Sequence, residues 1–298
     1  MMQIFPYEMK AHLRVSGEDA SDFLQSQFSN DLRPFEPGQA TYGLWLDAKG
    51  KVVADSWVLC EGPEHFRIFS EHCLPAVIAE KLERHIIADD VEIEVLSPAA
   101  VVAVVGEAGV PLAGDCKAAI ILPGHRSVEP SREYVFETVE ARDAFVRMNA
   151  AEVVSEHQIQ QLRLQAGVPM VPTEIGPGEL PGEGGLDVDA VAYDKGCFLG
   201  QEVVARMRNL GKATRGLYFV RGGGRVPECP QALLGDKEKV VGELRTAYPD
   251  EDSWIGVALL KIRHAASSLQ LKGQAGSIQV ESEYSRSRSD GNPIEKGG

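Results

Sequence analysis

Residues 193–202 read Tyr-Asp-Lys-Gly-Cys-Phe-Leu-Gly-Gln-Glu and place one cysteine, Cys197, where its thiol could become reactive. Apolar side chains at helical spacing follow, so a helix is predicted to begin just after the cysteine. A helix N-terminus offers unpaired N–H groups and the positive end of the helix dipole, and both favour thiolate over thiol. The positive charge of Lys195 would also favour the thiolate form of Cys197. The stretch predicts a thiolate that could attack an electrophile, form a mixed disulfide, or share a metal with a partner.

The alternative for Cys197 is a buried thiol without chemistry, because free cysteine is most often a small apolar core residue. The glycines on either side, Gly196 and Gly200, favour the close approach of another group to the backbone. Neither cysteine nor histidine stands near Cys197 in the sequence, so a metal site built by this chain alone is not predicted.

Asp55 is the second candidate, in a strand predicted over residues 51–59. Strand alternation places Asp55 on the same face as Val53 and Trp57. Burying an unpaired carboxylate on an apolar face is costly, so Asp55 is expected to have a partner or to face a cavity. An exposed charge on an edge strand is the alternative.

Three polar side chains complete the set of candidates. Gln27 falls close to an apolar helix face, so we expect it to be a hydrogen-bonding lining residue rather than a surface residue. Gln165 ends a helical stretch and could equally be an exposed helical glutamine. Arg206 belongs to a basic cluster after Cys197, which could meet an anionic ligand tail or lie on a solvated helix face.

The order of the predicted helices and strands that carry these residues indicates an α+β fold. Residues 1–98 alternate strand, helix, several strands, helix and strand, which is typical of a ferredoxin-like unit. Residues 99–215 form a second α+β unit that ends in the Cys197 loop and its helix. Short strands separated by turn residues over 216–284 predict a small β-barrel. The polar tail, 285–298, is predicted to be disordered.

Composition limits the classes of function. The 298-residue chain has a formal net charge of −14, so direct binding of nucleic acid is not expected. Its five cysteines are scattered and form no C-x-x-C pair, which argues against a disulfide framework or a standard zinc site and fits a reducing compartment. Neither a targeting segment nor a membrane span is recognisable, so we expect a cytoplasmic protein.

The run Lys-Gly-Cys-Phe-Leu-Gly-Gln-Glu, followed by Arg206, Gly211 and Arg215, resembles the signature of the YgfZ family. These proteins are relatives of the glycine-cleavage T-protein, an aminomethyltransferase, and the resemblance extends from about Met9 to about Arg263. It implies a T-protein-like body with a C-terminal barrel and tetrahydrofolate as the cofactor. It also implies iron–sulfur proteins or their assembly machinery as partners, including enzymes that modify tRNA.

The resemblance assigns roles by position. The T-protein has an aspartate at the position of Asp55, which acts at the reactive nitrogen of folate. At the position of Gln165 the T-protein has a glutamate that binds the pterin, because its two carboxylate oxygens accept two hydrogen bonds from the pterin edge. The side-chain amide of a glutamine has one accepting oxygen and one donating NH₂ group, so it would lose one of these two hydrogen bonds. Gln27, Lys195 and Arg206 are the further folate contacts that we expect, and Cys197 is the expected reactive thiol.

Three functions remain open on the sequence. A folate-dependent accessory factor for iron–sulfur proteins agrees with the whole signature. A true aminomethyltransferase is favoured by Asp55, while Gln165 and the Lys-Gly-Cys run, which the T-protein lacks, argue against it. A non-catalytic scaffold with weakened folate binding is compatible with Gln165.

Overall fold

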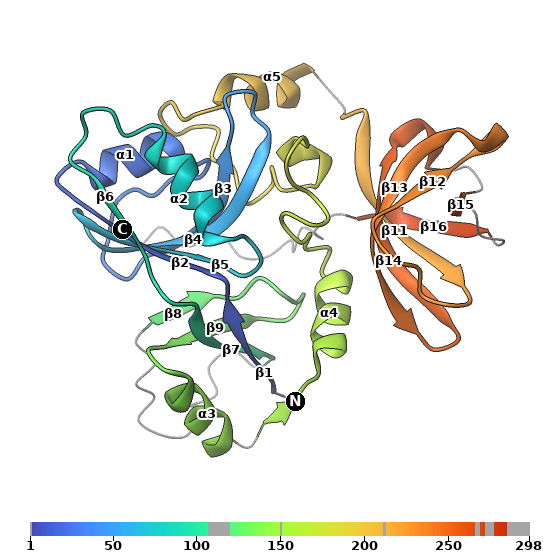
Figure 1. The fold of residues 1–298 in the computed structure, drawn as a ribbon, viewed down its shortest axis with the longest axis horizontal. Coiled ribbons are helices and arrows are strands. Elements are labelled where there is room, and N and C mark those ends of the chain that lie inside the picture. The colour runs from blue at the N-terminus through green and yellow to red at the C-terminus, as the bar shows by residue number, and fades with distance from the viewer. Residues whose placement is uncertain are drawn as a thin grey trace, which may run out of the picture.

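The structure, a computed structural model, describes residues 2–106, 120–149, 151–210, 213–265, 269–271 and 277–284. Three sheets organise the described chain (Figure 1). Two five-stranded sheets form the body, and a six-stranded sheet forms the C-terminal part. The tail predicted to be disordered, 285–298, lies outside the described residues.

The first body sheet has the strand order β3-β4-β5-β2-β6, with every neighbouring pair antiparallel. Its strands are β2 (Ala11–Ser16), β3 (Ala40–Leu46), β4 (Val52–Gly62), β5 (His65–Ser70) and β6 (Glu92–Val95). Helices α1 (Ala20–Gln27) and α2 (Pro75–Glu83) bury apolar side chains in a cluster shared with this sheet. The predicted succession of strands and helices is present, while the finer ferredoxin-like description stays a prediction.

The second body sheet has the order β10-β1-β7-β9-β8. Its strands are β1 (Gln3–Met9), β7 (Ala99–Val105), β8 (Ile120–Pro123), β9 (Ser131–Phe136) and β10 (Glu152–Val153). Strand β1 corrects the sequence analysis, which assigned the first residues to the first unit. It pairs antiparallel with β7 along its whole length, because the continuously buried apolar strand β7 needs a partner on that side. Helix α3 (Val139–Met148) lies between β9 and β10 in the chain, and helix α4 (Glu156–Gln165) follows β10.

A long irregular segment with one 3₁₀ turn, η1 (Pro181–Glu183), leads to helix α5 (Gln201–Leu210). Gly200, with φ of +84°, shows why the signature needs glycine immediately before α5. A Cβ at Gly200 would lie 2.6 Å from the Asp47 carbonyl oxygen and 2.9 Å from the Gly50 Cα. The close approach expected at the glycines is therefore confirmed at Gly200, whereas a Cβ at Gly196 would meet open space.

The C-terminal sheet is antiparallel, curled, and ordered β15-β12-β13-β14-β11-β16 (Figure 1). Its strands are β11 (Arg215–Gly223), β12 (Gln231–Leu234), β13 (Val240–Asp250), β14 (Ser253–Lys261), β15 (Gln270–Leu271) and β16 (Ile278–Glu283). Two short 3₁₀ turns, η2 (Asp236–Glu238) and η3 (Ile262–His264), lie between strands. The strands predicted between 216 and 262 are present.

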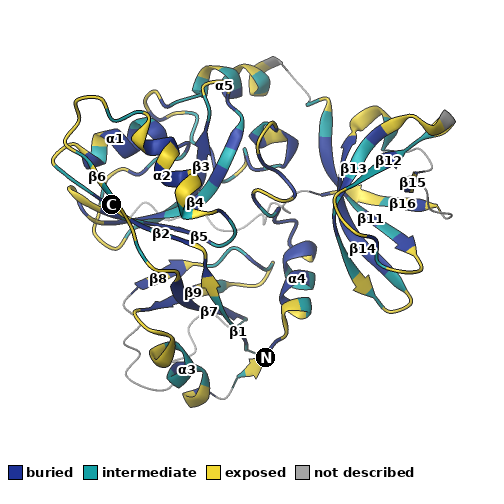
Figure 2. Cartoon of the chain, in the orientation of Figure 1, coloured by how far each residue is buried: buried dark blue, intermediate teal, exposed yellow. Residues whose placement is uncertain are grey.

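The largest apolar cluster joins the parts of the molecule. It contains side chains from the first sheet and its helices, from the irregular segment, and from the C-terminal strands β11 and β14. Figure 2 shows the buried residues concentrated in the sheets, with exposed residues along the outer turns and helix faces. A second cluster, which includes Leu59, Phe69, Met9 and Val101, packs the two body sheets against each other. The face of β4 that carries Asp55 is turned toward this junction.

Candidate active site between the two body sheets

Asp55 has partners and faces a cavity, as its place on an apolar strand face predicted. Its Oδ2 accepts from the Tyr42 hydroxyl at 2.9 Å, and its Oδ1 accepts from Ser70 Oγ at 3.1 Å and from Cys73 Sγ at 3.4 Å. A carboxylate has room for about four hydrogen bonds. One acceptor position therefore remains for a donor that enters the cavity.

Burial raises the pKa of Asp55, although hydrogen bonds from Tyr42, Cys73 and Ser70 and the nearby His72 act in the opposite direction. A carboxyl group that can hold a proton is able to accept from one ligand and donate to another. Burial raises the pKa of the Cys73 thiol to about 12, and the negative charge of Asp55 is the second largest cause of this increase. Cys73 therefore serves as a neutral neighbour of Asp55 and not as a nucleophile.

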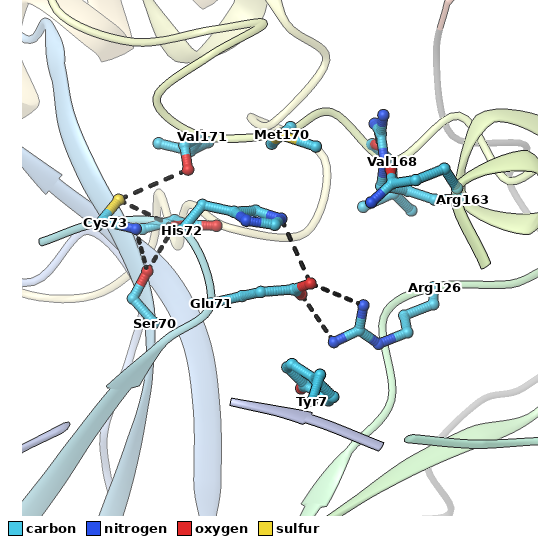
Figure 3. A network of polar contacts seen from close by, with 12 residues as sticks. Tyr7, Ser70, Glu71, His72, Cys73, Arg126, Arg163, Val168, Met170 and Val171 are labelled. Atoms are coloured by element: carbon cyan, nitrogen blue, oxygen red, sulfur yellow. Dashed lines mark hydrogen bonds and ion pairs between the residues drawn. The ribbon is translucent and has the colours of Figure 1, made fainter. Parts of the chain in front are cut away.

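The far wall of the cavity is a buried ion network (Figure 3). Arg126 bridges two carboxylates, with Glu71 Oε2 at 2.7 Å and Glu133 Oε1 at 2.8 Å. The Tyr7 hydroxyl donates to Glu133 at 3.0 Å, and the Arg126 guanidinium lies 4.3 Å from the centroid of the Tyr7 ring. His72 lies 3.4 Å from Glu71. The network brings charged side chains and the neutral Tyr7 hydroxyl together from four separate segments of the chain.

The two carboxylates of this network differ in protonation tendency. Burial raises the pKa of Glu133, against the pull of Arg126. For Glu71, burial is the largest single effect and would raise the pKa. The charges of Arg126 and His72 together act more strongly in the opposite direction, so the pKa of Glu71 is lowered. Burial lowers the pKa of His72, against the raising effects of Glu71 and Asp55. The cavity therefore places side by side a carboxyl group with a raised pKa, Glu133, and one with a lowered pKa, Glu71.

Aromatic rings form the remaining wall. Tyr42 on β3 and Trp57 on β4 have ring centroids 5.4 Å apart, and His125 lies against them from the loop between β8 and β9. A surface of rings beside a buried carboxyl group suits a flat heterocycle that carries N–H donors.

The size of the cavity limits what can enter. The space that a water-sized group can occupy is about 60 Å³, and all the space between the lining atoms, including some open solvent, is about 540 Å³. Pockets for small molecules typically span roughly 300–1,000 Å³. The space enclosed at present is therefore smaller than that of a typical small-molecule pocket.

Cys197 is exposed, which rejects the alternative of a thiol buried in the core. It precedes the first helical residue of α5, Gln201, and belongs to the irregular segment rather than to the helix. Neither the cavity of Asp55 nor its rim includes Cys197 among the lining residues in the described parts of the chain. The thiol therefore does not line the cavity that Asp55 faces.

Lys195 is turned away from the thiol surface. It is buried, and Nζ donates to the carbonyl oxygens of Gln25 at 2.8 Å, Phe28 at 2.7 Å and Asn30 at 2.7 Å. All donors of the ammonium group are used at the C-terminal end of α1, where helix carbonyls lack partners. Burial lowers the pKa of Lys195 to about 8. Its observed role is to hold the signature loop on α1.

Gln27 is buried, as predicted, but its partner is another lysine rather than the cavity. Lys81 Nζ on α2 donates to Gln27 Oε1 at 2.9 Å. Burial lowers the pKa of Lys81 to about 8. The pair joins α1 to α2 and keeps both helices in place over the first sheet.

The two remaining candidates lie at the surface. Gln165 is exposed at the end of α4, and Arg206 is exposed on α5. Neither is among the residues that line the Asp55 cavity. The residue of α4 that reaches this cavity is Arg163, which is buried.

Arg163 also ties the body to the C-terminal sheet. It forms a bidentate ion pair with Glu174, with distances of 2.7 and 2.9 Å. It also donates to the Tyr284 hydroxyl at 3.2 Å and to the Tyr248 hydroxyl at 3.4 Å. The pKa of Arg163 is raised because Glu174 and the two tyrosines outweigh its burial. One side chain thus lines the cavity and joins two sheets.

The sequence alone singled out none of the following polar residues that line the cavity: Tyr7, Glu71, His72, His125, Arg126, Glu133 and Arg163. Charged residues inside otherwise apolar strands are a usable signal, and Glu133 in β9 has it. Arg126 and His125 lie in a loop and have no such pattern. Among the described residues, no group of three or more His, Cys, Asp or Glu side chains is arranged to hold a metal ion. No helix of the described chain is both long and apolar enough to cross a membrane.

Comparisons with known proteins agree with the architecture. Residues 2–114 match the family model described as the GCVT N-terminal domain. The chain is 25% identical over 288 residues to a tRNA-modifying protein YgfZ from Serratia proteamaculans, covering 90% of this chain and 87% of that protein. It is also 25% identical over 255 residues to a protein of the same name from Vibrio vulnificus, covering 80% and 78%.

Among solved structures, the glycine cleavage system aminomethyltransferase T from Bartonella henselae superposes with a TM-score of 0.73. The match covers 94% of this chain and 85% of that one, at 15% sequence identity. At this identity the match establishes the fold, and the predicted T-protein-like architecture is confirmed.

Proposed function

From its similarity to YgfZ proteins and its T-protein-like fold, we propose that this protein belongs to the YgfZ family, binds a reduced folate and supports iron–sulfur enzymes, including ones that modify tRNA. The relatives are named for tRNA modification. With a net charge of −14, the chain itself is a poor ligand for tRNA phosphates. Its contribution to tRNA modification is therefore indirect, through an enzyme that does contact the RNA.

The observation that carries the folate proposal is Asp55, a carboxyl group with one acceptor position left and a ring-lined wall beside it. A pterin presents N–H groups along one edge, which pair with a carboxylate. The groups that would hold it are Asp55 at the edge and Tyr42 and Trp57 against the face. When bound, tetrahydrofolate supplies a carrier for one-carbon units.

The chain's own contribution to the chemistry is the handling of protons at that edge. The raised pKa of Asp55 means that it releases its proton at a higher pH than an exposed aspartate does. Tyr42, Ser70 and Cys73 fix the orientation of its two oxygens. Aminomethyl transfer is the second candidate function, because Asp55 is the residue that the T-protein uses.

The thiol of Cys197 is proposed to act on the partner protein. It is exposed on a loop that Lys195 anchors to α1, so a partner could reach it without displacing core side chains. Gln165 remains a proposed contact for the pterin and Arg206 for the anionic tail of the folate, and both side chains are exposed. Gln27 and Lys195, which are buried in helix contacts, would support the site from behind.

Calorimetric titration of the full chain with 5-formyltetrahydrofolate tests the folate proposal. Saturable binding in the micromolar range or tighter is expected. A titration without saturable heat would leave the scaffold function instead. Incubation with an aminomethylated lipoyl carrier and tetrahydrofolate separates the transferase function, which requires release of methylene-tetrahydrofolate at a rate comparable with that of a competent T-protein.

A further inference from the structure

A second hollow lies in the part of the chain that carries the signature, between the 3₁₀ turn η1 and helix α5, and we call it the η1–α5 cleft. The space that a water-sized group can occupy there is about 330 Å³, near the lower end of the roughly 300–1,000 Å³ of pockets for small molecules. None of its lining residues lines the Asp55 cavity. Most of its walls are apolar, formed by Leu180, Pro181, Tyr193, Val204, Met207 and Ala213.

Contacts within the chain fix the shape of the cleft. Glu183 of η1 is buried and accepts from Arg215 through both carboxylate oxygens, each at 2.9 Å. Its Oε2 also accepts from the backbone N–H of Leu180 at 2.9 Å. On the opposite wall, Val204 of α5 is buried. The cleft is therefore formed before anything binds, and the charge of Glu183 is already paired.

Two further charged side chains, Asp187 and Arg208, line the cleft. Within the described parts of the chain, neither forms an ion pair or a side-chain hydrogen bond. Both lie beside Tyr193: the Arg208 guanidinium is 4.0 Å from the centroid of its ring. Burial, and after it the charge of Asp187, raises the pKa of Tyr193 to about 12, against the effect of Arg208.

These charges complement the backbone of a peptide. Asp187 can accept from a backbone N–H, and Arg208 can donate to a backbone C=O. A side chain from the same peptide would then enter the apolar hollow between them, as in other sites where main-chain hydrogen bonds hold a peptide and pockets select its side chains. The opposite charges of Asp187 and Arg208 balance, so a neutral backbone suits the cleft better than a polyanion does.

The position of Cys197 relates the cleft to the signature. Cys197 follows Tyr193 by four residues and precedes Gln201, the first residue of α5, by four. Four residues span at most about 14 Å, so the Cys197 Cα lies within that distance of the cleft wall at Tyr193 and of the start of α5. The thiol is exposed, and Val188, next to Asp187, has 52% of its side chain exposed. Apolar contact surface thus continues outside the cleft.

We propose that the η1–α5 cleft binds an extended segment of the partner protein, with a large aliphatic side chain of that segment in the cleft and the neighbouring residues beside Cys197. The inference rests on the proposed action of Cys197 on a partner protein. An exposed thiol by itself meets every protein alike. A segment held in the cleft is kept next to the thiol, which raises the rate of reaction for that segment alone.

The test measures thiol–disulfide exchange at Cys197 in the full chain, with Cys116 and Cys229 replaced by serine; Cys60 and Cys73 are buried. The probes are acetylated peptide amides in which one to four glycines separate a leucine from a cysteine that carries thionitrobenzoate in a mixed disulfide. The Cys197 thiolate attacks the peptide sulfur, so that a disulfide between Cys197 and the peptide forms. The bond to thionitrobenzoate breaks and this group leaves as a coloured thiolate, whose release gives the rate.

At least one leucine peptide is expected to react about tenfold faster than the peptide with glycine in place of leucine, because the leucine side chain is buried in the complex. Met207→Gln, which makes one wall polar at similar length, should remove most of this difference. Met148→Gln is the matched control, since Met148 ends α3 with 53% of its side chain exposed, and it should retain the difference. Every variant should react with the glycine peptide as the parent chain does.

Asp187→Ala should slow the reaction of the leucine peptide by about two- to tenfold, the range of one hydrogen bond, and it carries the test if the Met207 variant does not fold. Equal rates for leucine and glycine peptides at every spacing would overturn the inference while leaving the thiol reactive. So would a leucine advantage that both cleft variants retain. If no peptide reacts with Cys197, the proposed role of the thiol fails, and the inference with it.

Discussion

Lys195 Nζ lies 2.7 Å from the Phe28 carbonyl oxygen, so the lysine of the signature motif is bound to the end of the first helix. This contact makes Lys195 a structural anchor for the loop that presents Cys197. It separates two features that adjoin in the sequence, a buried cation and an exposed thiol.

Replacing Lys195 by methionine should destabilise the protein. The carbonyl oxygens of Gln25, Phe28 and Asn30 would lose their donor, and a buried unsatisfied group costs about 1–3 kcal/mol. Urea unfolding measures the change in the free energy of unfolding. Lys49→Met is the control, since Lys49 is exposed in the β3–β4 turn and should show no comparable loss. Equal stability of the two variants would refute the anchoring role.

Replacing Cys197 by serine should leave folding intact and reduce the activity of iron–sulfur enzymes in cells that depend on this protein. The thiol is exposed, so the substitution removes no core contact. The melting temperature and the enzyme activity are measured together. Cys229→Ser, at another exposed cysteine, should retain activity. If both serine variants support the enzymes as well as the parent chain, the thiol has no part in the function.

Replacing Asp55 by asparagine should weaken binding of 5-formyltetrahydrofolate by about tenfold or more, because a hydrogen bond to a charged group contributes about 1.5–3 kcal/mol. The amide also turns a donor toward Tyr42, Ser70 or Cys73. Calorimetry gives the dissociation constant. Asp252→Asn, in an exposed turn of the C-terminal sheet, should bind as the parent does. Unchanged affinity for the Asp55 variant would place the ligand elsewhere.

Stability should increase as the pH rises from about 8 toward 10. Burial lowers the pKa of Lys81 and of Lys195 to about 8, against 10.5 in the unfolded chain. In this interval the unfolded state binds more protons than the folded state, so the free energy of unfolding rises with pH. Above pH 10, the raised pKa values of buried Tyr7 and Tyr284 act in the opposite direction.

Urea unfolding at several pH values across this interval measures the slope, and Lys81→Gln should reduce it while Lys49→Met should not. A slope that is flat in the parent chain, or unaffected by the Lys81 substitution, would contradict the expectation.

Replacing Arg163 by methionine should lower the free energy of unfolding by about 3–5 kcal/mol, because Glu174 would stay buried without its partner. Glu174→Met should cost a similar amount. The double variant should lose much less than the sum of the two, since it leaves no uncompensated charge. Additive losses in this cycle would mean that the pair is not a coupled unit.

Local patterns in the sequence were sufficient to predict several features of the structure. Strand alternation placed Asp55 on the Trp57 face, and the need of a buried carboxyl group for partners predicted its contacts. The glycine before α5 predicted a close backbone approach, and Gly200 has one. The succession of strands and helices follows the same short-range periodicities. The signature run was distinctive enough to indicate the family.

Only the tertiary structure decided which side chains meet in the cavity and where Lys195 points. Lys195 bonds to Gln25 across 170 positions of the chain, and Tyr7 bonds to Glu133 across 126. Such contacts depend on strand order, above all on β1 joining the second sheet, and no local pattern encodes them. The physical reason is that hydrophobicity and turn chemistry act over a few residues, whereas a buried charge takes the partner that sheet packing brings to it.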